Sequence, residues 1–550
     1  MKGLKRRQFL SSAAAAVAGA SVPVAARAGT IPTTKSQERV VVIGSGFGGG
    51  VSALRLAQAG IQVLVLERGK WWPTGPNAET FPHATTLDKR ELFYNIWPEV
   101  NGKRIGINPY VGLLEPVFGK GIVAVTPACV GGGSLIYQGM TLRPTESLFK
   151  ACFPQIDYEP MRSIYYQRVA QMLQVATAPD ELVNSPPYKA SRVFAERVQA
   201  AGFGVEKIPM PIDWNYALAE LRGEMKPSYT NGDGALGVNN GGKHSVDVTY
   251  LAQAIATGNV TVAAQHNVTS IARSSNGDWL VYADRTDESG NVLERKVITT
   301  KTLILSAGTV NTSKLLVRAK ARDDIPGLPS GVGEGYGTNG DQIYVWTSKT
   351  EDFGPIQGGP VVYGSKEWAN AGQPANTVIQ ASLPPLTKKS SATSTNAMPS
   401  ALLPGAASAS VTSSSSDMHS TMLVGYGMSS SRGRFSYNVL TDKVELSWPS
   451  KGDAPVAKRI HDRLAAIVDS NDTLINTNDI INTTWHSLGG ACMGVVCDTE
   501  GRVKGQRGLY VLDGALMPGA TCACNPSMTI AAIVERALDI IVQNDIGTII

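Results

Sequence analysis

The sequence predicts an α/β fold in which two domains are interwoven, and three observations lead to this class. The segment 39–69 has the pattern of a strand, a glycine-rich turn, a helix and a second strand. The chain has 550 residues, which exceeds one ordinary domain. A late apolar strand, 509–512, has the character needed to return to the first sheet, while strand-like segments between 360 and 448 predict a second, antiparallel sheet.

The glycines at 44–49, in the order G-S-G-F-G-G, have the spacing of a dinucleotide-binding turn. Gly44 permits the sharp turn, Gly46 lets a pyrophosphate approach bare backbone, and Gly49 lets the helix pack closely on the sheet. The second strand ends in Glu67, whose carboxylate can accept hydrogen bonds from ribose hydroxyls. The unit predicts a Rossmann-like site for FAD or NAD rather than NADP. An ordinary glycine turn is the alternative interpretation.

The composition, with 43% hydrophobic and 17% charged residues, is that of a soluble globular protein with a large core. The formal charge of +5 comes from the first 28 residues, which hold five Lys or Arg and no acidic residue. Without those five, 45 basic residues balance 45 acidic ones. This balance gives no support for nucleic acid or an anionic membrane as a partner.

The N-terminus has the pattern of an export signal. Residues 4–10 contain a twin arginine followed by Phe-Leu, residues 11–22 form a weakly apolar alanine-rich run, and Ala26-Arg27-Ala28 offers small residues at a cleavage spacing. We therefore expect 1–28 to be a Tat-type signal peptide, and the mature protein to be periplasmic or secreted. A membrane anchor or a chance basic start is the alternative. The run is too short to span a membrane, and no other apolar stretch is long enough, so no integral membrane span is predicted.

The six cysteines do not predict a metal site, because their spacings match no zinc pattern. An exported protein could form disulfides from them. A bond between Cys522 and Cys524 would be strained, since only one residue separates them. The sequence does not determine which cysteines would pair.

Two further segments before residue 420 bear on the site. The triple glycine at 131–133 lets backbone lie against a flat ring or a phosphate, with a plain turn as the alternative. Residues 387–417 are biased to Ser, Thr and Ala, which indicates a loop or lid, or else a disordered insertion. We expect 36–140, 240–345 and 475–550 to form the cofactor domain, and 141–239 and 346–474 to form an α+β substrate domain.

The C-terminal part holds the remaining candidates. His486 is followed closely by Gly489-Gly490, and an apolar strand ends in Asp513-Gly514, whose carboxylate can bind a ribityl or phosphate-bridging hydroxyl. A helix that begins after Asn525-Pro526 directs its N-terminal N–H groups and positive dipole toward that region. A reduced flavin, which is anionic at N1, is a suitable partner for such a helix end.

In this order the motifs resemble the glucose-methanol-choline family of flavoenzymes and, within it, the bacterial cholesterol oxidases that hold FAD without a covalent bond. The likeness runs from about residue 39 to residue 544. It implies non-covalent FAD bound by Gly44, Gly46, Phe47, Gly48, Gly49, Glu67, Gly131, Gly132, Gly133, Ser134, Tyr137, Gly139, Met140, Val268, Ala307, Gly308, Asp513, Gly514, Asn525 and Pro526.

The resemblance also implies catalytic roles. His486 would accept the proton of a substrate hydroxyl while hydride leaves for flavin N5, and Asn525 would orient that hydroxyl. An imidazole suits this exchange near neutral pH, although a lone histidine is often only structural. The family's steroid-isomerising glutamate should fall near Gln380. An amide cannot carry a proton between two carbons, so isomerisation is not expected.

The chain departs from the family pattern at Thr126–Cys129, Tyr137-Gln138 and Ser487. We expect oxidation of a secondary alcohol, such as a sterol 3-hydroxyl or a similar apolar alcohol, to the ketone, with electrons passed to oxygen and hydrogen peroxide released. Transient contact with a lipid surface is compatible with such a substrate. The alternatives are a dehydrogenase that uses another acceptor on a non-sterol alcohol, and a flavin-binding protein that no longer oxidises.

Overall fold

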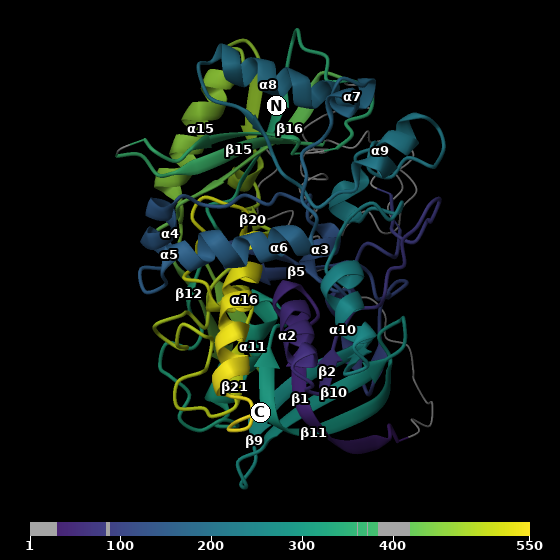
Figure 1. Ribbon diagram of the computed structural model, residues 1–550, viewed down its shortest axis with the longest axis vertical. Coiled ribbons are helices and arrows are strands. Elements are labelled where there is room, and N and C mark those ends of the chain that lie inside the picture. Colours follow the sequence, from purple (N-terminus) through teal and green to yellow (C-terminus); the bar gives the residue numbers. More distant parts are fainter. Residues whose placement is uncertain (1–29, 84–87, 360, 371, 383–417) are drawn as a thin grey trace.

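The computed structural model describes residues 30–83, 88–359, 361–370, 372–382 and 418–550 (Figure 1). The expected signal peptide, 1–28, and the Ser/Thr-rich segment, 387–417, both lie outside these ranges. Predictions made for those two segments therefore stay predictions.

The lower half of Figure 1 contains a seven-stranded sheet of order β8-β2-β1-β11-β10-β9, to which β21 is added beside β11. Five strands are parallel: β1 (Thr33–Ile43), β2 (Val63–Leu66), β8 (Val260–Ala263), β11 (Val292–Leu305) and β21 (Leu509–Val511). The antiparallel strands are β9 (His266–Arg273) and β10 (Trp279–Thr286). The α/β class and the Rossmann-like unit are confirmed.

One expected strand is divided in two. Apolar and polar side chains alternate over residues 260–271, which predicts a single strand, but β8 ends at Ala263 and β9 begins at His266. Between them Gln265 has a φ of 56°, a left-handed conformation that reverses the chain. β8 then pairs parallel with β2, whereas β9 pairs antiparallel with β10.

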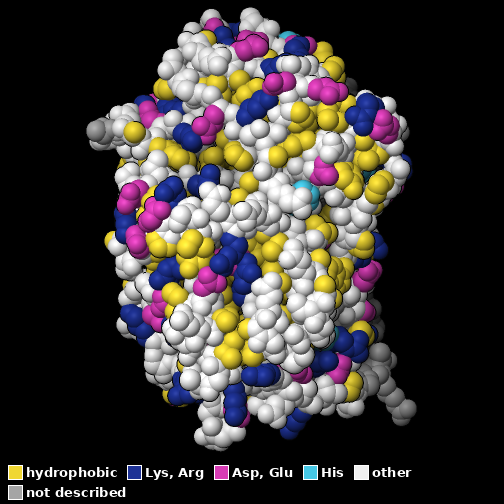
Figure 2. Space-filling model, viewed as in Figure 1, with side chains coloured by type: hydrophobic (Ala, Val, Ile, Leu, Met, Phe, Trp, Pro, Cys, Tyr) yellow, Lys and Arg dark blue, Asp and Glu magenta, His cyan; other side chains and the backbone are white. Residues whose placement is uncertain are grey.

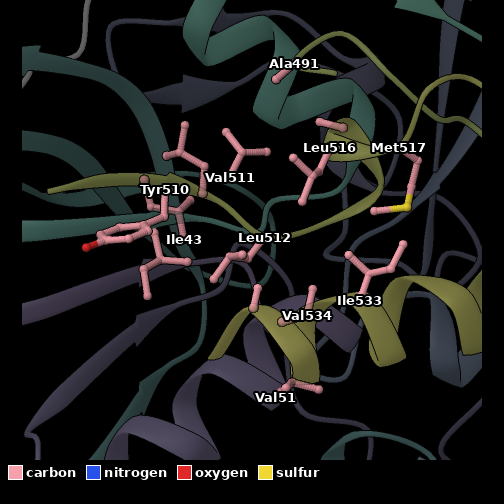
Figure 3. Close-up of a cluster of buried hydrophobic side chains, with 14 of the residues drawn as sticks. Ile43, Val51, Ala491, Tyr510, Val511, Leu512, Leu516, Met517, Ile533 and Val534 are labelled. Atoms are coloured by element: carbon pink, nitrogen blue, oxygen red, sulfur yellow. The ribbon is translucent and has the colours of Figure 1, made fainter. Parts of the chain in front are cut away.

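Two helices lie side by side on the first sheet: α2 (Phe47–Gln58), in purple, and α16 (Pro526–Asn544), in yellow (Figure 1). Figure 3 shows the core that joins them to the sheet, with Val51, Val511 and Ile533 among its side chains. Both helices start at the edge where the parallel strands end. Apolar burial of this kind stabilises by about 25 cal/mol per Å², and here it fixes the two helix N-termini relative to the sheet.

A second sheet of six antiparallel strands has the order β19-β13-β16-β15-β14-β7. Its strands are β7 (Glu206–Lys207), β13 (Gln342–Thr347), β14 (Tyr363–Glu367), β15 (Asn376–Ala381), β16 (Ser420–Gly427) and β19 (Thr473–Asn476). Helices α8 (Lys189–Ala200) and α15 (Ala454–Ile467) pack on one face. The domain boundaries expected at 345 and 474 fall inside β13 and β19, and the division into domains stays a prediction.

Smaller sheets join the two large ones. Residues 434–438 and 443–448 flank Thr441-Asp442 in a pattern that predicts a hairpin. The structure confirms it as β17 (Gly433–Asn438) paired with β18 (Lys443–Ser447), and β17 also pairs with β12 (Glu334–Tyr336). Residues 71–120 have aromatics and prolines but no sustained period, which predicts a loop. The hairpin of β5 (Leu114–Gly119) and β6 (Ile122–Pro127), with β20 (Thr483–Thr484), nevertheless begins inside this stretch. Glu115-Pro116 in its first strand obscured the signal, because proline is rare in strands.

The other α-helices among the described residues are α3 (Gly133–Ile136), α4 (Glu146–Cys152), α5 (Tyr158–Pro160), α6 (Tyr166–Met172), α7 (Asp180–Val183), α9 (Trp214–Leu221), α10 (Ala252–Ala256) and α11 (Thr309–Ala321). Basic and acidic side chains are interspersed on the face seen in Figure 2. Among the described residues, the structure contains no helix with the length and apolar character needed to cross a membrane.

Candidate active site

Four parallel strands of the first sheet end at the predicted cofactor residues. β1 runs into Gly44, β2 into Glu67, β11 into Ser306 and β21 into Leu512-Asp513. Dinucleotides bind outside the carboxyl ends of such strands, where the helix that follows the first strand offers its N-terminus to the phosphates. The residues predicted to bind the cofactor therefore lie together at the carboxyl ends of these parallel strands.

The glycines between β1 and α2 are required by close approach. Gly44 has a φ of 95°, and a Cβ built there would lie 2.2 Å from the Ser306 carbonyl oxygen. A Cβ on Gly48 would lie 1.7 Å from the Leu512 carbonyl oxygen. Gly46 differs, because its Cβ would meet no atom closer than Gly132 Cα at 3.8 Å. Space is thus left above Gly46, where the backbone is open to a ligand.

Glu67 is buried at the end of β2 and is held by protein donors. The Ser45 hydroxyl donates to its Oε2 at 2.7 Å, and the Gly69 N–H donates to its Oε1 at 2.9 Å. The Ser45 N–H also donates to Oε2, at 3.2 Å. A carboxylate can accept about four hydrogen bonds, so capacity for a ribose hydroxyl remains. Val268 lies close by on β9, since the N–H of His266, two residues earlier, donates to the Glu67 carbonyl oxygen.

The triple glycine lies against the first glycine turn. A Cβ on Gly132 would be 2.7 Å from Gly46 Cα, whereas one on Gly133 would meet nothing within 4 Å. The next residues are tied by buried Lys243, whose Nζ donates to the carbonyl oxygens of Leu135, at 2.8 Å, and Tyr137. Burial lowers the pKa of Lys243 to about 7. Both predicted glycine segments therefore line one space.

The remaining predicted cofactor residues frame the same region. Ser134 Oγ accepts from the Val246 N–H. The rings of Phe47 and Tyr137 pack in a T-shaped pair, and the buried Tyr137 hydroxyl has no partner in the described structure. Gly139 lies over Pro211, and Met140 Sδ accepts from the Tyr426 hydroxyl at 3.4 Å.

Asp513 is buried at the end of β21. Thr312 Oγ1 donates to its Oδ2 at 2.5 Å and the Ala515 N–H donates to its Oδ1 at 2.8 Å. Burial raises the pKa of Asp513 to about 6, against those hydrogen bonds. The Ala307-Gly308 turn adjoins it, and Gly514 lies against Thr309.

His486 and Asn525, both predicted to be catalytic, lie side by side. The amide Nδ2 of Asn525 lies 3.1 Å from His486 Nε2. Asn525 caps α16 and is fixed by Ser527, whose hydroxyl donates to the Asn525 Oδ1 at 2.7 Å, while Pro526 occupies the first turn. The ring of Tyr426 stands at 84° to the imidazole, with centroids 5.6 Å apart.

A carboxylate that was not predicted supports the histidine. Asp341 Oδ1 lies 2.6 Å from His486 Nδ1, and its side chain is 4% exposed. Three donors hold the other oxygen, Oδ2: the Thr484 hydroxyl at 2.8 Å and the N–H groups of Trp485 and His486 at 3.1 and 3.2 Å. Since the carboxylate accepts, Nδ1 carries the imidazole proton and Nε2 is left as the acceptor.

The prediction that Gln380 lies at the position of the family's isomerising glutamate is wrong. Its side chain is buried beneath α8, where the Ser191 hydroxyl donates to its Oε1 at 3.0 Å and its Nε2 donates to the Ala381 carbonyl oxygen. Alternate residues of a strand point to opposite faces of the sheet. Ile379 and Ala381, not Gln380, lie on the face that contains Tyr426 and adjoins Trp485. Gln380 therefore cannot occupy the place of a catalytic acid.

The space between the glycine segments fits FAD on observations of this structure. Gly46 and Gly133 leave it open, four strand ends and the α2 N-terminus supply backbone, and the Tyr137 hydroxyl is buried without a partner. His486 and Asn525 lie at the start of α16, which packs beside α2. A dinucleotide cradle beside an imidazole that a carboxylate orients fits an FAD-dependent alcohol oxidoreductase.

Comparison with known proteins specifies the class. Family models described as GMC oxidoreductase match residues 111–334 and 409–533, and the protein belongs to this family. It is similar to a cholesterol oxidase of Mycobacterium tuberculosis, with 27% identity over 90% of each chain. A cholesterol oxidase of Acinetobacter baumannii is 24% identical over 91% of this chain and 94% of that protein.

Solved structures of other proteins share the fold of this chain. Pyridoxine 4-oxidase from Mesorbium loti superposes with a TM-score of 0.59, at 14% identity, over 91% of this chain and 98% of that one. The GMC oxidoreductase fold and the assignment as a flavoprotein are thus established, while the roles of individual residues are proposals.

Proposed function

We propose that the protein oxidises a secondary alcohol with an apolar, sterol-like body to the ketone, using non-covalently bound FAD. The observation that carries this proposal is the imidazole of His486, held by buried Asp341 and placed 3.1 Å from Asn525 at the start of α16. The likeness to cholesterol oxidases supports both the apolar substrate and the non-covalent cofactor.

The proton step follows from the tautomer. Asp341 holds the proton on Nδ1, so Nε2 can accept the proton of a substrate hydroxyl placed between His486 and Asn525. The Oδ1 of Asn525 is engaged by Ser527, which leaves its amide N–H groups to donate to the substrate oxygen. When bound, FAD supplies the acceptor for the hydride and passes the electrons to oxygen, which gives hydrogen peroxide.

Tyr426, which packs against His486, belongs to an apolar face of the second sheet that we call the apolar wall. The wall is formed by side chains of the second sheet and by Trp485, namely Ile343, Ile379, Ala381, Met422, Val424 and Tyr426. Such a wall favours an apolar alcohol over a sugar. Within the described strands β13, β15 and β16 no carboxylate lies on this face, so we propose oxidation without double-bond isomerisation.

The test is a substrate panel on purified holoenzyme. Cholesterol, smaller steroids and straight-chain secondary alcohols are added without oxygen, and bleaching of the flavin band is recorded. We expect bleaching by the apolar alcohols, then oxygen consumption with peroxide release once air is admitted. Bleaching without oxygen consumption would indicate a dehydrogenase, and a flavin that no alcohol bleaches would refute the proposal.

A pair of variants tests the base. His486→Ala should lower kcat by about a hundredfold or more, as expected for loss of a general base. His461→Ala, in an exposed position on α15, is the matched control and should keep wild-type turnover. Equal activity of the two variants would remove His486 from the mechanism.

We also propose that the protein is exported. The support is the twin arginine within 4–10, the alanine-rich run and Ala26-Arg27-Ala28. Replacing both arginines by lysine should retain the protein in the cytoplasm in a bacterial export assay. Unchanged export would contradict a Tat route.

A further inference from the structure

One turn, residues 338–341, lies behind both residues of the proposed site. It closes on itself just before β13, because the Asp341 N–H donates to the Thr338 carbonyl oxygen at 3.3 Å. It is also fixed to the second sheet, because the Gly427 N–H, at the end of β16, donates to the Asn339 carbonyl oxygen at 2.8 Å. Asp341, the last residue of this turn, holds the imidazole of the proposed base.

The side chain of Asn339 reaches the loop that carries Asn525, and it is fully buried. Its Nδ2 donates to the carbonyl oxygen of Cys524, the residue directly before Asn525, at 2.8 Å. Its Oδ1 accepts from the Thr521 N–H at 3.0 Å. The Thr521 hydroxyl donates to the same Cys524 carbonyl oxygen, at 3.0 Å. The amide of Asn339 thus closes the turn 521–524 at both ends and fixes the peptide group that precedes Asn525.

The loop depends on such bonds because its backbone is strained. Cys522 and Ala523 have φ values of 63° and 57°, which are left-handed conformations that few residues other than glycine adopt. Strain of this kind persists only where the surrounding structure holds it. The Thr377 hydroxyl supplies one more bond, to the Ala523 carbonyl oxygen at 2.8 Å. Asn339 supplies the bonds at the two ends of the strained pair.

We propose that Asn339 is a positioning residue that sets the place of Asn525 relative to His486. Two side chains of one turn then hold the two groups, Asp341 the imidazole and Asn339 the amide, whose Nδ2 lies 3.1 Å from His486 Nε2. The inference rests on the proposed function, because the two groups share a substrate hydroxyl only in that mechanism. A misplacement of about 1 Å in such a pair can cost about a hundredfold in rate.

Asn339→Asp is the decisive variant, because aspartate has the same shape and tolerates the left-handed φ of 55° at this position. It keeps an acceptor for the Thr521 N–H but places an oxygen against the Cys524 carbonyl oxygen. The repulsion should displace Asn525. ¹⁵N spectra of the holoenzyme with labelled histidine measure this, since His486 Nε2 accepts from the Asn525 amide. We expect the Nε2 signal to shift toward that of an imidazole nitrogen without a hydrogen bond, while the proton stays on Nδ1.

The second measurement is stopped-flow reduction of the flavin by an alcohol that bleaches the wild-type enzyme. We expect the rate in Asn339→Asp to fall by about tenfold or more, with FAD content and KM little changed. Asn339→Gly also keeps the left-handed backbone and buries no charge. It should shift the Nε2 signal and slow reduction in the same direction, and it serves if the aspartate variant does not fold.

Asn239→Asp is the matched control. Asn239 is 3% exposed, and its amide accepts from the Phe81 N–H at 2.8 Å and donates to the Phe81 carbonyl oxygen at 3.4 Å. The same chemical change at this buried amide should lower the thermal midpoint but leave the Nε2 signal and the rate of flavin reduction as in the wild type.

The inference is overturned if a folded Asn339 variant leaves the Nε2 signal unchanged, or shifts it without slowing flavin reduction. It is also overturned if Nδ1 loses its proton, which would place the effect on Asp341, or if Asn239→Asp slows reduction equally. The spectra need no alcohol. If the variants shift the Nε2 signal but no alcohol bleaches the wild-type flavin, the positioning by Asn339 stands and the proposed oxidation fails.

Discussion

At the scale of single residues, the proposed base, His486, depends on the carboxylate that holds its ring, Asp341. In the proposed mechanism, His486 offers Nε2 to the substrate because Asp341 accepts from Nδ1, and Asp341 is held in place by three donors on its other oxygen. An imidazole ring in a neutral state can carry its proton on either nitrogen. The carboxylate thus decides which nitrogen can act.

Asp341→Asn tests this arrangement sharply. The three donors require an oxygen, so the asparagine would turn its carbonyl oxygen to them and its NH₂ to His486 Nδ1. The ring would then carry its proton on Nε2 and could not accept one there. We expect kcat to fall by about tenfold or more, as when the carboxylate behind a catalytic histidine is amidated. Stopped-flow reduction of the flavin measures this step.

The control for Asp341→Asn is the state of the imidazole. ¹⁵N spectra of labelled histidine should show the proton moved from Nδ1 to Nε2, with FAD content and KM little changed. Loss of FAD, or lower activity with the tautomer unchanged, would indicate a purely structural role for Asp341.

Asp341 could not have been found from the sequence. It follows Asn339-Gly340, which is typical of a turn, and it is 145 residues from His486. His486 and Asn525 were found through their place in a resemblance, not through any local signal. A contact between distant residues leaves no periodic trace in the chain.

At the scale of elements, the sequence predicted those strands, turns and helices whose shape depends on residues close together in the chain. The strand, turn and helix at 39–69 were predicted because the apolar pattern and the glycine spacing are continuous in the chain. The neighbours that require Gly44 and Gly48, Ser306 and Leu512, lie outside that unit and came only with the structure. The face on which Gln380 lies was not predictable in this way. A shift of one residue in a strand moves a side chain to the other face of the sheet, and an approximate position cannot resolve it.

Gln380→Glu should therefore not create an isomerase. The new carboxylate would lie beneath α8, where its oxygen would face the Ala381 carbonyl oxygen that Gln380 Nε2 now donates to. We expect a loss of about 1–3 kcal/mol in stability, the cost of an unsatisfied buried group. Thermal unfolding checks this, and ultraviolet spectra of the steroid product should show no conjugated enone. A conjugated product would place residue 380 in the active site.

Gly46→Ala tests FAD binding independently of folding. The added methyl has no protein atom nearer than 3.8 Å, so the chain should fold, but it would occupy the space left for the cofactor. We expect FAD binding to weaken by about 1–3 kcal/mol, the cost of overpacking, with little change in apoprotein unfolding. Fluorescence titration of apoprotein with FAD measures it. Gly204→Ala, at an exposed glycine with no neighbour within 4 Å, is the control and should bind FAD normally.

At the scale of the whole molecule, the site exists because two sheets meet. The glycine cradle and Asn525 belong to the first sheet and its helices, while Asp341 precedes β13 of the second sheet and the apolar wall lies on that sheet. The sequence predicted most of the part of the site that lies on the first sheet, because a dinucleotide-binding unit is continuous in the chain. The wall is assembled from strands separated by long segments, so its composition came only with the structure.

The two helices that carry the site are joined by a buried carboxylate. Glu535 of α16 is fully buried and accepts two hydrogen bonds from Arg55 of α2, at 2.7 and 2.8 Å, one from Arg168 and one from the Tyr250 hydroxyl. Removing one partner of a buried pair leaves the other charge unsatisfied. This network fixes α16, and with it Asn525, relative to the glycine turn that begins α2.

Glu535→Gln should lower stability by about 2–3 kcal/mol, less than for a wholly enclosed pair because Arg55 and Arg168 are partly exposed. The thermal midpoint of the holoenzyme should fall, and FAD should be released at lower temperature, because the helix that carries Asn525 loses its tie to α2. The control is Asp462→Asn in the exposed Lys458–Asp462 pair, which should cost under about 0.5 kcal/mol. If both variants unfold at the same temperature, packing alone, and not this network, holds the two helices together.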